Sequence, residues 1–166
     1  MNKKTLAAMV APLVVLSALS FAQQSGVTKD QIVGSWNLAS VELVQEGKKQ
    51  QPFGPSPKGY LSFDRNGTYA MLLFRPGTPP FAKRGRLSGT DAENKAVVHN
   101  SQAYYGTYKL KEKDGLLEIR VDQSTYPNHD GTDQRRMIRV AGDELVIANP
   151  DTPGGGSAQL VFKRIK

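Results

Sequence analysis

The stretch STYPNHDGTDQRR, residues 124–136, carries the densest group of side chains that could do chemistry. His129 stands next to Asp130, Asp133 follows, and Arg135 and Arg136 end the run. These residue types can bind a metal, form an acid–base pair or hold an anion. They can equally form a polar loop that leads into a strand. The surrounding elements must decide between these interpretations.

The chain offers few of the groups that metal sites and nucleophilic catalysis require. Its two histidines are His99 and His129, and it has no cysteine. A zinc site needs three or four ligands, and a calcium loop needs a closing Glu that this run lacks. The G-x-S-x-G nucleophile motif is also missing. We therefore predict no metal, no cofactor and no catalytic residue, and we expect His129 and Asp130 to lie in solvent.

Two polar residues follow the run in phase with apolar ones. Gln134 and Arg136 alternate along one strand face with Ile138 and Val140, because side chains on a strand repeat every second residue. If that face lines an interior, Gln134 and Arg136 lie at its mouth. A buried Arg needs a partner. That partner is either a protein carboxylate or carbonyl, or an oxygen of a ligand held by the guanidinium fork.

The N-terminal 22 residues have the layout of a secretory signal peptide. Lys3 and Lys4 precede an apolar run over 6–19, and small residues lead up to Ala22. A membrane anchor is the alternative, but this run is shorter than the roughly 20 residues of a spanning helix. We predict cleavage after Ala22, a periplasmic or secreted location and no stable membrane insertion. A linker over 23–31 and one domain over 32–166 would follow.

Charge and size limit the partners that we expect. The formal net charge is +7, with Lys and Arg scattered along the chain rather than clustered. No nucleic-acid recognition motif accompanies this charge, so we predict no nucleic-acid partner. Without cysteine there is no disulfide framework. We expect a monomer or weak dimer.

Alternating apolar and polar residues, separated by turn signals, predict an all-β protein. One helix is predicted from Thr90 to about Gln102, between the third and fourth strands, with Thr90 as its cap. Short turns make neighbouring strands antiparallel. Eight such strands can close as an up-and-down β-barrel, and an open sandwich is the alternative. The predicted strands are 32–44, 60–63, 68–74, 104–111, 116–124, 134–140, 144–148 and 158–165.

The same period of two turns several large side chains inward. They combine apolar bulk with hydroxyl groups, which suits either a packed core with satisfied hydroxyls or a ligand pocket. These inward residues are Phe63, Tyr69, Met71, Tyr104 and Tyr108.

Several segments, in their order, resemble the bacterial lipocalin-like domain proteins. Gly34-Ser35-Trp36 is similar to the G-x-W element of lipocalins, in which an Arg near the C-terminus packs over the Trp; Arg164 is its counterpart. The resemblance implies an eight-stranded barrel with a cavity for a small, largely apolar molecule. His129 and Asp130 depart from the family pattern. The matching segments are PFGPSPKGYLSF, FRPGTPPFA, AYYGTYKL, YPNHDGTDQRR and LVFKRIK.

We therefore expect an exported lipocalin-like protein that binds a small hydrophobic or amphipathic molecule inside its barrel. The alternative is a small barrel enzyme of isomerase or cyclase type, with His129 or a Tyr as its acid or base. A third interpretation is an envelope protein that acts through its surface. The predicted ligand-binding residues are Phe63, Tyr69, Met71, Tyr104, Tyr108, Gln134 and Arg136.

Overall fold

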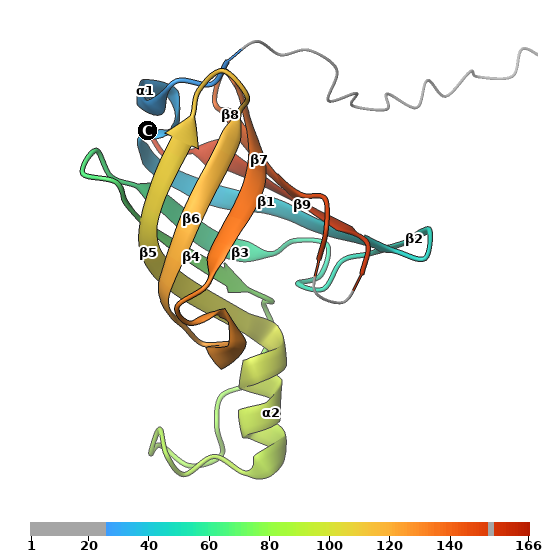
Figure 1. The fold of residues 1–166 in the computed structure, drawn as a ribbon. Helices are drawn as coiled ribbons and strands as arrows, with labels where there is room; N and C mark the ends of the chain where they lie inside the picture. The colour runs from blue at the N-terminus through green and yellow to red at the C-terminus, as the bar shows by residue number, and fades with distance from the viewer. Residues whose placement is uncertain (1–25, 153–154) are drawn as a thin grey trace, which may run out of the picture.

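The computed structural model describes residues 26–152 and 155–166, and over these residues nine antiparallel strands form one sheet that closes on itself (Figure 1). Strand β1 pairs with both β3 and β9, which closes a barrel of eight strands. The predicted eight-stranded antiparallel barrel is confirmed. The strands are β1 Gly34–Gln45, β2 Lys48–Gln50, β3 Lys58–Phe63, β4 Thr68–Phe74, β5 Ser101–Lys111, β6 Leu116–Ser124, β7 Asp133–Ala141, β8 Glu144–Asn149 and β9 Ser157–Arg164.

The additional strand β2 makes the predicted position of the helix wrong. Helix α2, Asp91–Asn100, follows the fourth strand, β4, and not the third. The sequence pattern missed β2 because its three residues are all exposed and show no apolar alternation. It pairs with the end of β1 through a turn at Glu46 and Gly47, both with positive φ.

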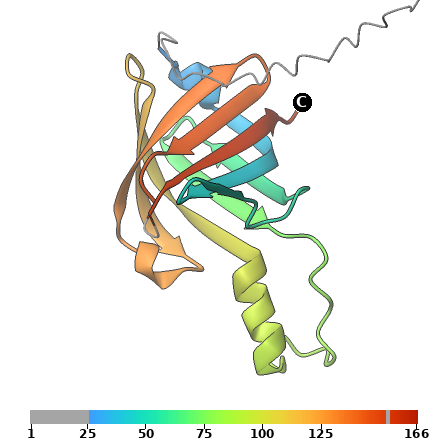
Figure 2. The ribbon, with the colours of Figure 1, turned by 90° about the vertical axis from the view of Figure 1, so that its right-hand side faces the viewer.

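Helix α2 projects away from the barrel (Figures 1 and 2). Thr90 caps it as predicted, since its hydroxyl accepts the N–H of Glu93 while the Glu93 carboxylate accepts the N–H of Thr90. None of its ten residues is fully buried. No helix of the described residues has the length and apolar character needed to cross a membrane.

The predicted inward faces of the strands are confirmed. Buried side chains alternate along β3, β4, β5 and β6, as a period of two requires. On β7, Ile138 and Val140 are buried in the core, in phase with the partly buried Gln134 and Arg136. The sequence therefore assigned the two faces of these strands correctly.

One end of the barrel is closed by the N-terminal segment. Helix α1, Lys29–Ile32, occupies residues that we assigned to the linker and the first strand, and Ile32 is fully buried. The Arg164 guanidinium lies 4.0 Å from the centre of the Trp36 ring, which confirms the predicted pair. Arg164 also donates to the backbone oxygens of Val33 and Gln31.

The opposite end carries the loop between β6 and β7 and the projecting helix α2 (Figure 1). In this loop a 3₁₀ helix, η1, spans Pro127–His129. The stretch that holds His129, Gln134 and Arg136 therefore lies at the end of the barrel that α1 leaves uncovered.

Candidate ligand-binding site

The interior of the barrel is nearly filled by its own side chains. Its enclosed cavity measures about 20 Å³, which is close to the volume that one water molecule needs. Of the two alternatives, a packed core and a ligand pocket, the interior is closer to the packed core, because the aromatic and branched side chains occupy most of the space. The cavity is lined by Phe63, Tyr69, Met71, Tyr104, Leu117, Ile119, Arg136, Ile147 and Leu160.

Five of the seven predicted ligand-binding residues border this cavity: Phe63, Tyr69, Met71, Tyr104 and Arg136.

The other two predicted residues do not border this cavity. The Tyr108 hydroxyl donates to the backbone oxygen of Asp64 at 2.8 Å, in the β3–β4 turn. The Gln134 side chain donates to the Thr132 hydroxyl at 3.1 Å and accepts from Arg136. Gln134 thus holds the guanidinium in place beside the cavity.

Arg136 is the central group of the site. Its guanidinium donates to the backbone oxygen of Arg135 at 2.7 Å and to the Gln134 side chain. In the described part of the chain, no carboxylate forms an ion pair with it. Burial lowers its pKa below the ordinary value, although an Arg stays protonated in proteins. The structure therefore places a partly buried cation at the cavity without a counter-charge.

Two tyrosines border the same cavity as this cation. The Tyr69 hydroxyl is buried and makes no hydrogen bond within the described residues. The Tyr104 hydroxyl donates to the sulfur of Met71 at 2.9 Å, and sulfur is a weak acceptor. Burial raises the pKa of both hydroxyls above the usual tyrosine value. Both therefore stay protonated and can donate a hydrogen bond.

A β-bulge in the β5–β6 pairing positions Tyr104. The register shifts between Tyr105 and Gly106, so that Tyr104 pairs with Ser124 while Gly106 pairs with Val121. A Cβ atom at position 106 would lie 1.9 Å from the backbone oxygen of Arg120. Only glycine permits this close approach of the two strands.

His129 packs against Tyr104 and Tyr126 rather than lying free in solvent, which corrects the expectation from the sequence. Its ring is partly buried and meets the rings of Tyr104 and Tyr126 edge-on, with centroid distances of 6.2 and 4.9 Å. Burial and the nearby Arg136 lower its pKa, so the imidazole is neutral near pH 7. Its Nδ1 is buried without a hydrogen-bond partner among the described residues.

Asp130 is also partly buried, and its hydrogen bonds hold the loop together. Its carboxylate accepts the backbone N–H of Ser124 at 2.7 Å and the side-chain amide of Gln123 at 2.5 Å. These bonds fasten η1 to the end of β6. Asp130 therefore fixes the loop, and the His129 ring packs against Tyr104 and Tyr126.

A wider hollow lies outside the cavity, between η1 and the loop after β8, and we call it the vestibule. It has a volume of about 420 Å³, and Arg136 borders both the vestibule and the inner cavity. The period of two located Gln134 and Arg136. The end of β8 lies beside them because β7 and β8 pair as an antiparallel hairpin, with Met137 opposite Ala148. The vestibule is lined by Asn128, His129, Thr132, Asp133, Gln134, Arg135, Arg136, Asn149, Pro150 and Asp151.

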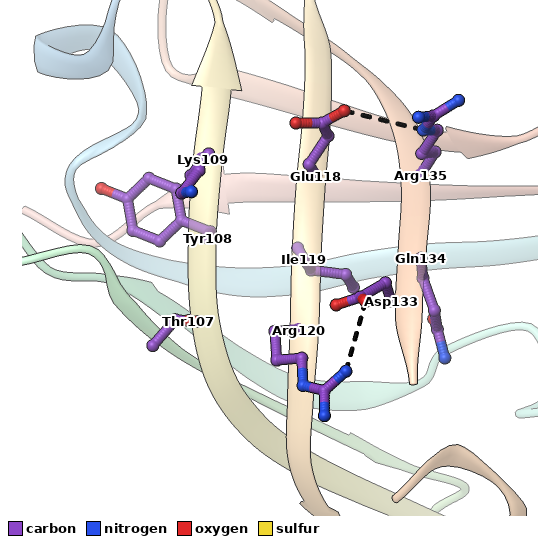
Figure 3. Close-up of a pocket in the computed structure, with 9 residues that line it drawn as sticks. All are labelled: Thr107, Tyr108, Lys109, Glu118, Ile119, Arg120, Asp133, Gln134 and Arg135. Atoms are coloured by element: carbon purple, nitrogen blue, oxygen red, sulfur yellow. Dashed lines mark hydrogen bonds and ion pairs between the residues drawn. The ribbon is translucent and has the colours of Figure 1, made fainter. Parts of the chain in front are cut away.

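A second hollow lies on the outer face of β5, β6 and β7 (Figure 3). Four of its five charged groups form pairs, Glu118 with Arg135 at 3.6 Å and Arg120 with Asp133 at 3.2 Å, and the fifth is Lys109. Exposed ion pairs of this kind need no ligand. The unpaired cation Arg136 makes the vestibule the stronger candidate.

Comparison with known proteins agrees with the barrel fold. The sequence model of a family described as a lipocalin-like domain matches residues 33–165. The chain is also 32% identical over 82 residues to a protein of Aspergillus oryzae (strain ATCC 42149 / RIB 40) named 4'-hydroxy-3'-methoxypropiophenone carrier protein ppsC. That match covers 46% of this chain and 74% of the carrier protein. With a matching family model over nearly all of the described barrel, this chain belongs to the lipocalin-like domain family.

Proposed function

We propose that this protein is a carrier that binds a small, oxygenated amphipathic molecule at the open end of its barrel. The observation that carries the proposal is Arg136, a partly buried cation without a carboxylate partner in the described chain, which borders both the cavity and the vestibule. A buried charge without a partner is costly, and a ligand oxygen would offset that cost. The Aspergillus relative is named as a carrier of an aromatic ketone, which supports the same class of function.

The sizes of the two spaces define how such a ligand would lie. The vestibule of about 420 Å³ falls within the range of small-molecule pockets, whereas the cavity of about 20 Å³ admits no ring. The body of the ligand therefore lies in the vestibule and one polar group reaches inward. Arg136 and Tyr104 contact that group, while Phe63, Met71 and Tyr108 support them from the core.

Binding fits the site better than acid–base catalysis does. A tyrosine acts as a base only when it ionises, and burial raises the pKa of Tyr69 and Tyr104. His129 is neutral, but the neighbouring Asp130 carboxylate is engaged by Ser124 and does not orient the imidazole. Replacing His129 with Ala separates the two functions, because an enzyme that uses it should lose about a hundredfold in rate.

The binding test uses a ligand of known chemistry and two matched variants. We expect 4'-hydroxy-3'-methoxypropiophenone to bind saturably in isothermal titration calorimetry. Asn128→Trp places a large ring in the vestibule and should weaken binding at least about tenfold. Thr107→Trp adds the same ring to the outer hollow of β5–β7 and should leave binding unchanged. Binding that is lost in Thr107→Trp and kept in Asn128→Trp would overturn the proposed site.

We also propose that the protein is exported and acts in the periplasm or outside the cell as a monomer or weak dimer. The signal-peptide pattern of residues 1–22, which lie outside the described residues, supports export. N-terminal sequencing of the mature protein should begin at Gln23. A mature chain that begins at residue 1 and stays in the cytoplasm would contradict export. Sedimentation analysis tests the oligomeric state.

A further inference from the structure

We propose that the ligand of this site is a monoacid with one carboxylate oxygen that enters the inner cavity and binds Arg136, Tyr69 and Tyr104. This inference rests on the proposed function and names the chemical class of its ligand.

The first argument is that the polar groups around the cavity are hydrogen-bond donors whose capacity is not fully used within the described residues. Arg136 has five N–H donors, and two of its nitrogens bond to Arg135 and Gln134. The Tyr69 hydroxyl has no partner in the described chain, and the Tyr104 hydroxyl has only a sulfur. An ionised oxygen accepts several such bonds at once, and charge-assisted bonds are the strong ones.

The second argument is charge. Both tyrosines stay neutral because burial raises their pKa values, so neither supplies the negative charge that Arg136 lacks. His129 is also neutral, because burial and Arg136 lower its pKa. The lining of the inner cavity therefore carries the charge of one guanidinium, and a single anion balances it.

The third argument is size and shape. The cavity of about 20 Å³ takes an oxygen-sized head group, while a ring remains in the vestibule. There the ring of His129, which Tyr104 and Tyr126 hold in place by edge-on contacts, offers an aromatic surface against which a flat ligand can pack. A compact aromatic acid matches this arrangement, whereas a long alkyl chain has no matching space in the filled barrel.

The fourth argument limits the ligand to one acidic group. Asp133 and Asp151 lie on the vestibule lining, away from the inner cavity that Arg136 borders. A second carboxylate on the ligand would lie near these like charges, which is unfavourable. We therefore expect a monoacid to bind better than the corresponding diacid.

The test compares an acid with a neutral ketone of nearly the same shape. The two probes are 4-hydroxy-3-methoxybenzoate and 4'-hydroxy-3'-methoxyacetophenone. They have the same hydroxy-methoxyphenyl ring, which carries a carboxylate in the first and an acetyl group in the second. We expect calorimetry at pH 7 to show at least about tenfold tighter binding of the acid. Arg136→Met should remove that difference while the ketone still binds. Arg65→Met removes the same charge from the surface beside Asp30 and should change neither affinity.

A second variant covers the possibility that Arg136→Met fails to fold. Tyr69→Phe removes one donor and should narrow the preference for the acid. Equal affinities of the wild-type protein for both probes would overturn the monoacid inference and leave the carrier function standing. Binding of neither probe would overturn both. A preference that survives in Arg136→Met would show that the acid binds elsewhere.

Discussion

Two inward-facing tyrosines provide a sharp test of the packing described here, because their hydroxyls have opposite environments. The Tyr69 hydroxyl is buried without a hydrogen bond in the described chain. The Tyr108 hydroxyl donates to the backbone oxygen of Asp64 at 2.8 Å. Replacing either residue with Phe removes one oxygen and keeps the ring. The ring contacts of Tyr69 with Phe63 and Tyr104, with centroids 6.4 and 6.1 Å apart, should survive the change.

The two changes should shift stability in opposite directions. A buried hydroxyl without a partner costs about 1–3 kcal/mol, so Tyr69→Phe should raise the free energy of unfolding by about 1–2 kcal/mol. A normal hydrogen bond contributes about 1 kcal/mol, so Tyr108→Phe should lower the free energy of unfolding by about that amount. The two variants should therefore differ by about 2–3 kcal/mol.

Urea unfolding at pH 7 without ligand measures both values on the same scale. The m-values should match that of the wild-type protein, because neither change alters the surface exposed on unfolding. A loss of stability in Tyr69→Phe as large as that in Tyr108→Phe would refute the reasoning. It would mean that the Tyr69 hydroxyl makes a stabilising interaction in the free protein.

Two further predictions concern the closed end and the loop. Arg164→Met removes the guanidinium over Trp36 and two hydrogen bonds to backbone oxygens, so it should lower the free energy of unfolding, measured in urea, by about 2–3 kcal/mol. The control Lys163→Met removes an exposed ion pair with Glu144 and should lower it by less than about 1 kcal/mol. Equal losses in the two variants would contradict this account. Folding lowers the pKa of His129, so as the pH falls this histidine is protonated in the unfolded chain before it is protonated in the folded protein. The free energy of unfolding should therefore decrease as the pH falls below about 6.5, the ordinary pKa of histidine. Between pH 7.5 and pH 5.5, the melting temperature of His129→Gln should fall less than that of His99→Gln. Equal decreases in melting temperature would show that His129 does not cause the loss of stability at low pH.

The strand pattern explains why so much of the barrel was predictable. Each strand from β3 to β9 alternates buried and exposed residues, or lies between clear turn signals, so its inward face could be assigned from the sequence. Trp36 and Arg164 were paired through the family resemblance. The short elements were missed because α1 and β2 have four and three residues, too few to show a period.

The site itself was predictable only in part. Arg136 follows from strand phase, since it shares a face with Ile138. The burial of His129 does not, because it depends on Asp130 fastening η1 to Ser124 across a loop. The volume of the cavity also escapes a sequence pattern, which indicates which side chains point inward but not how tightly they fill the space.

The measurement that tests the central claim most directly is a crystal structure of the protein with 4'-hydroxy-3'-methoxypropiophenone. We predict that the ring lies in the vestibule between η1 and the end of β8, with a ligand oxygen within hydrogen-bond distance of the Arg136 guanidinium. A ligand bound in the outer hollow of β5–β7 (Figure 3), or one that leaves Arg136 without contact, would contradict the account.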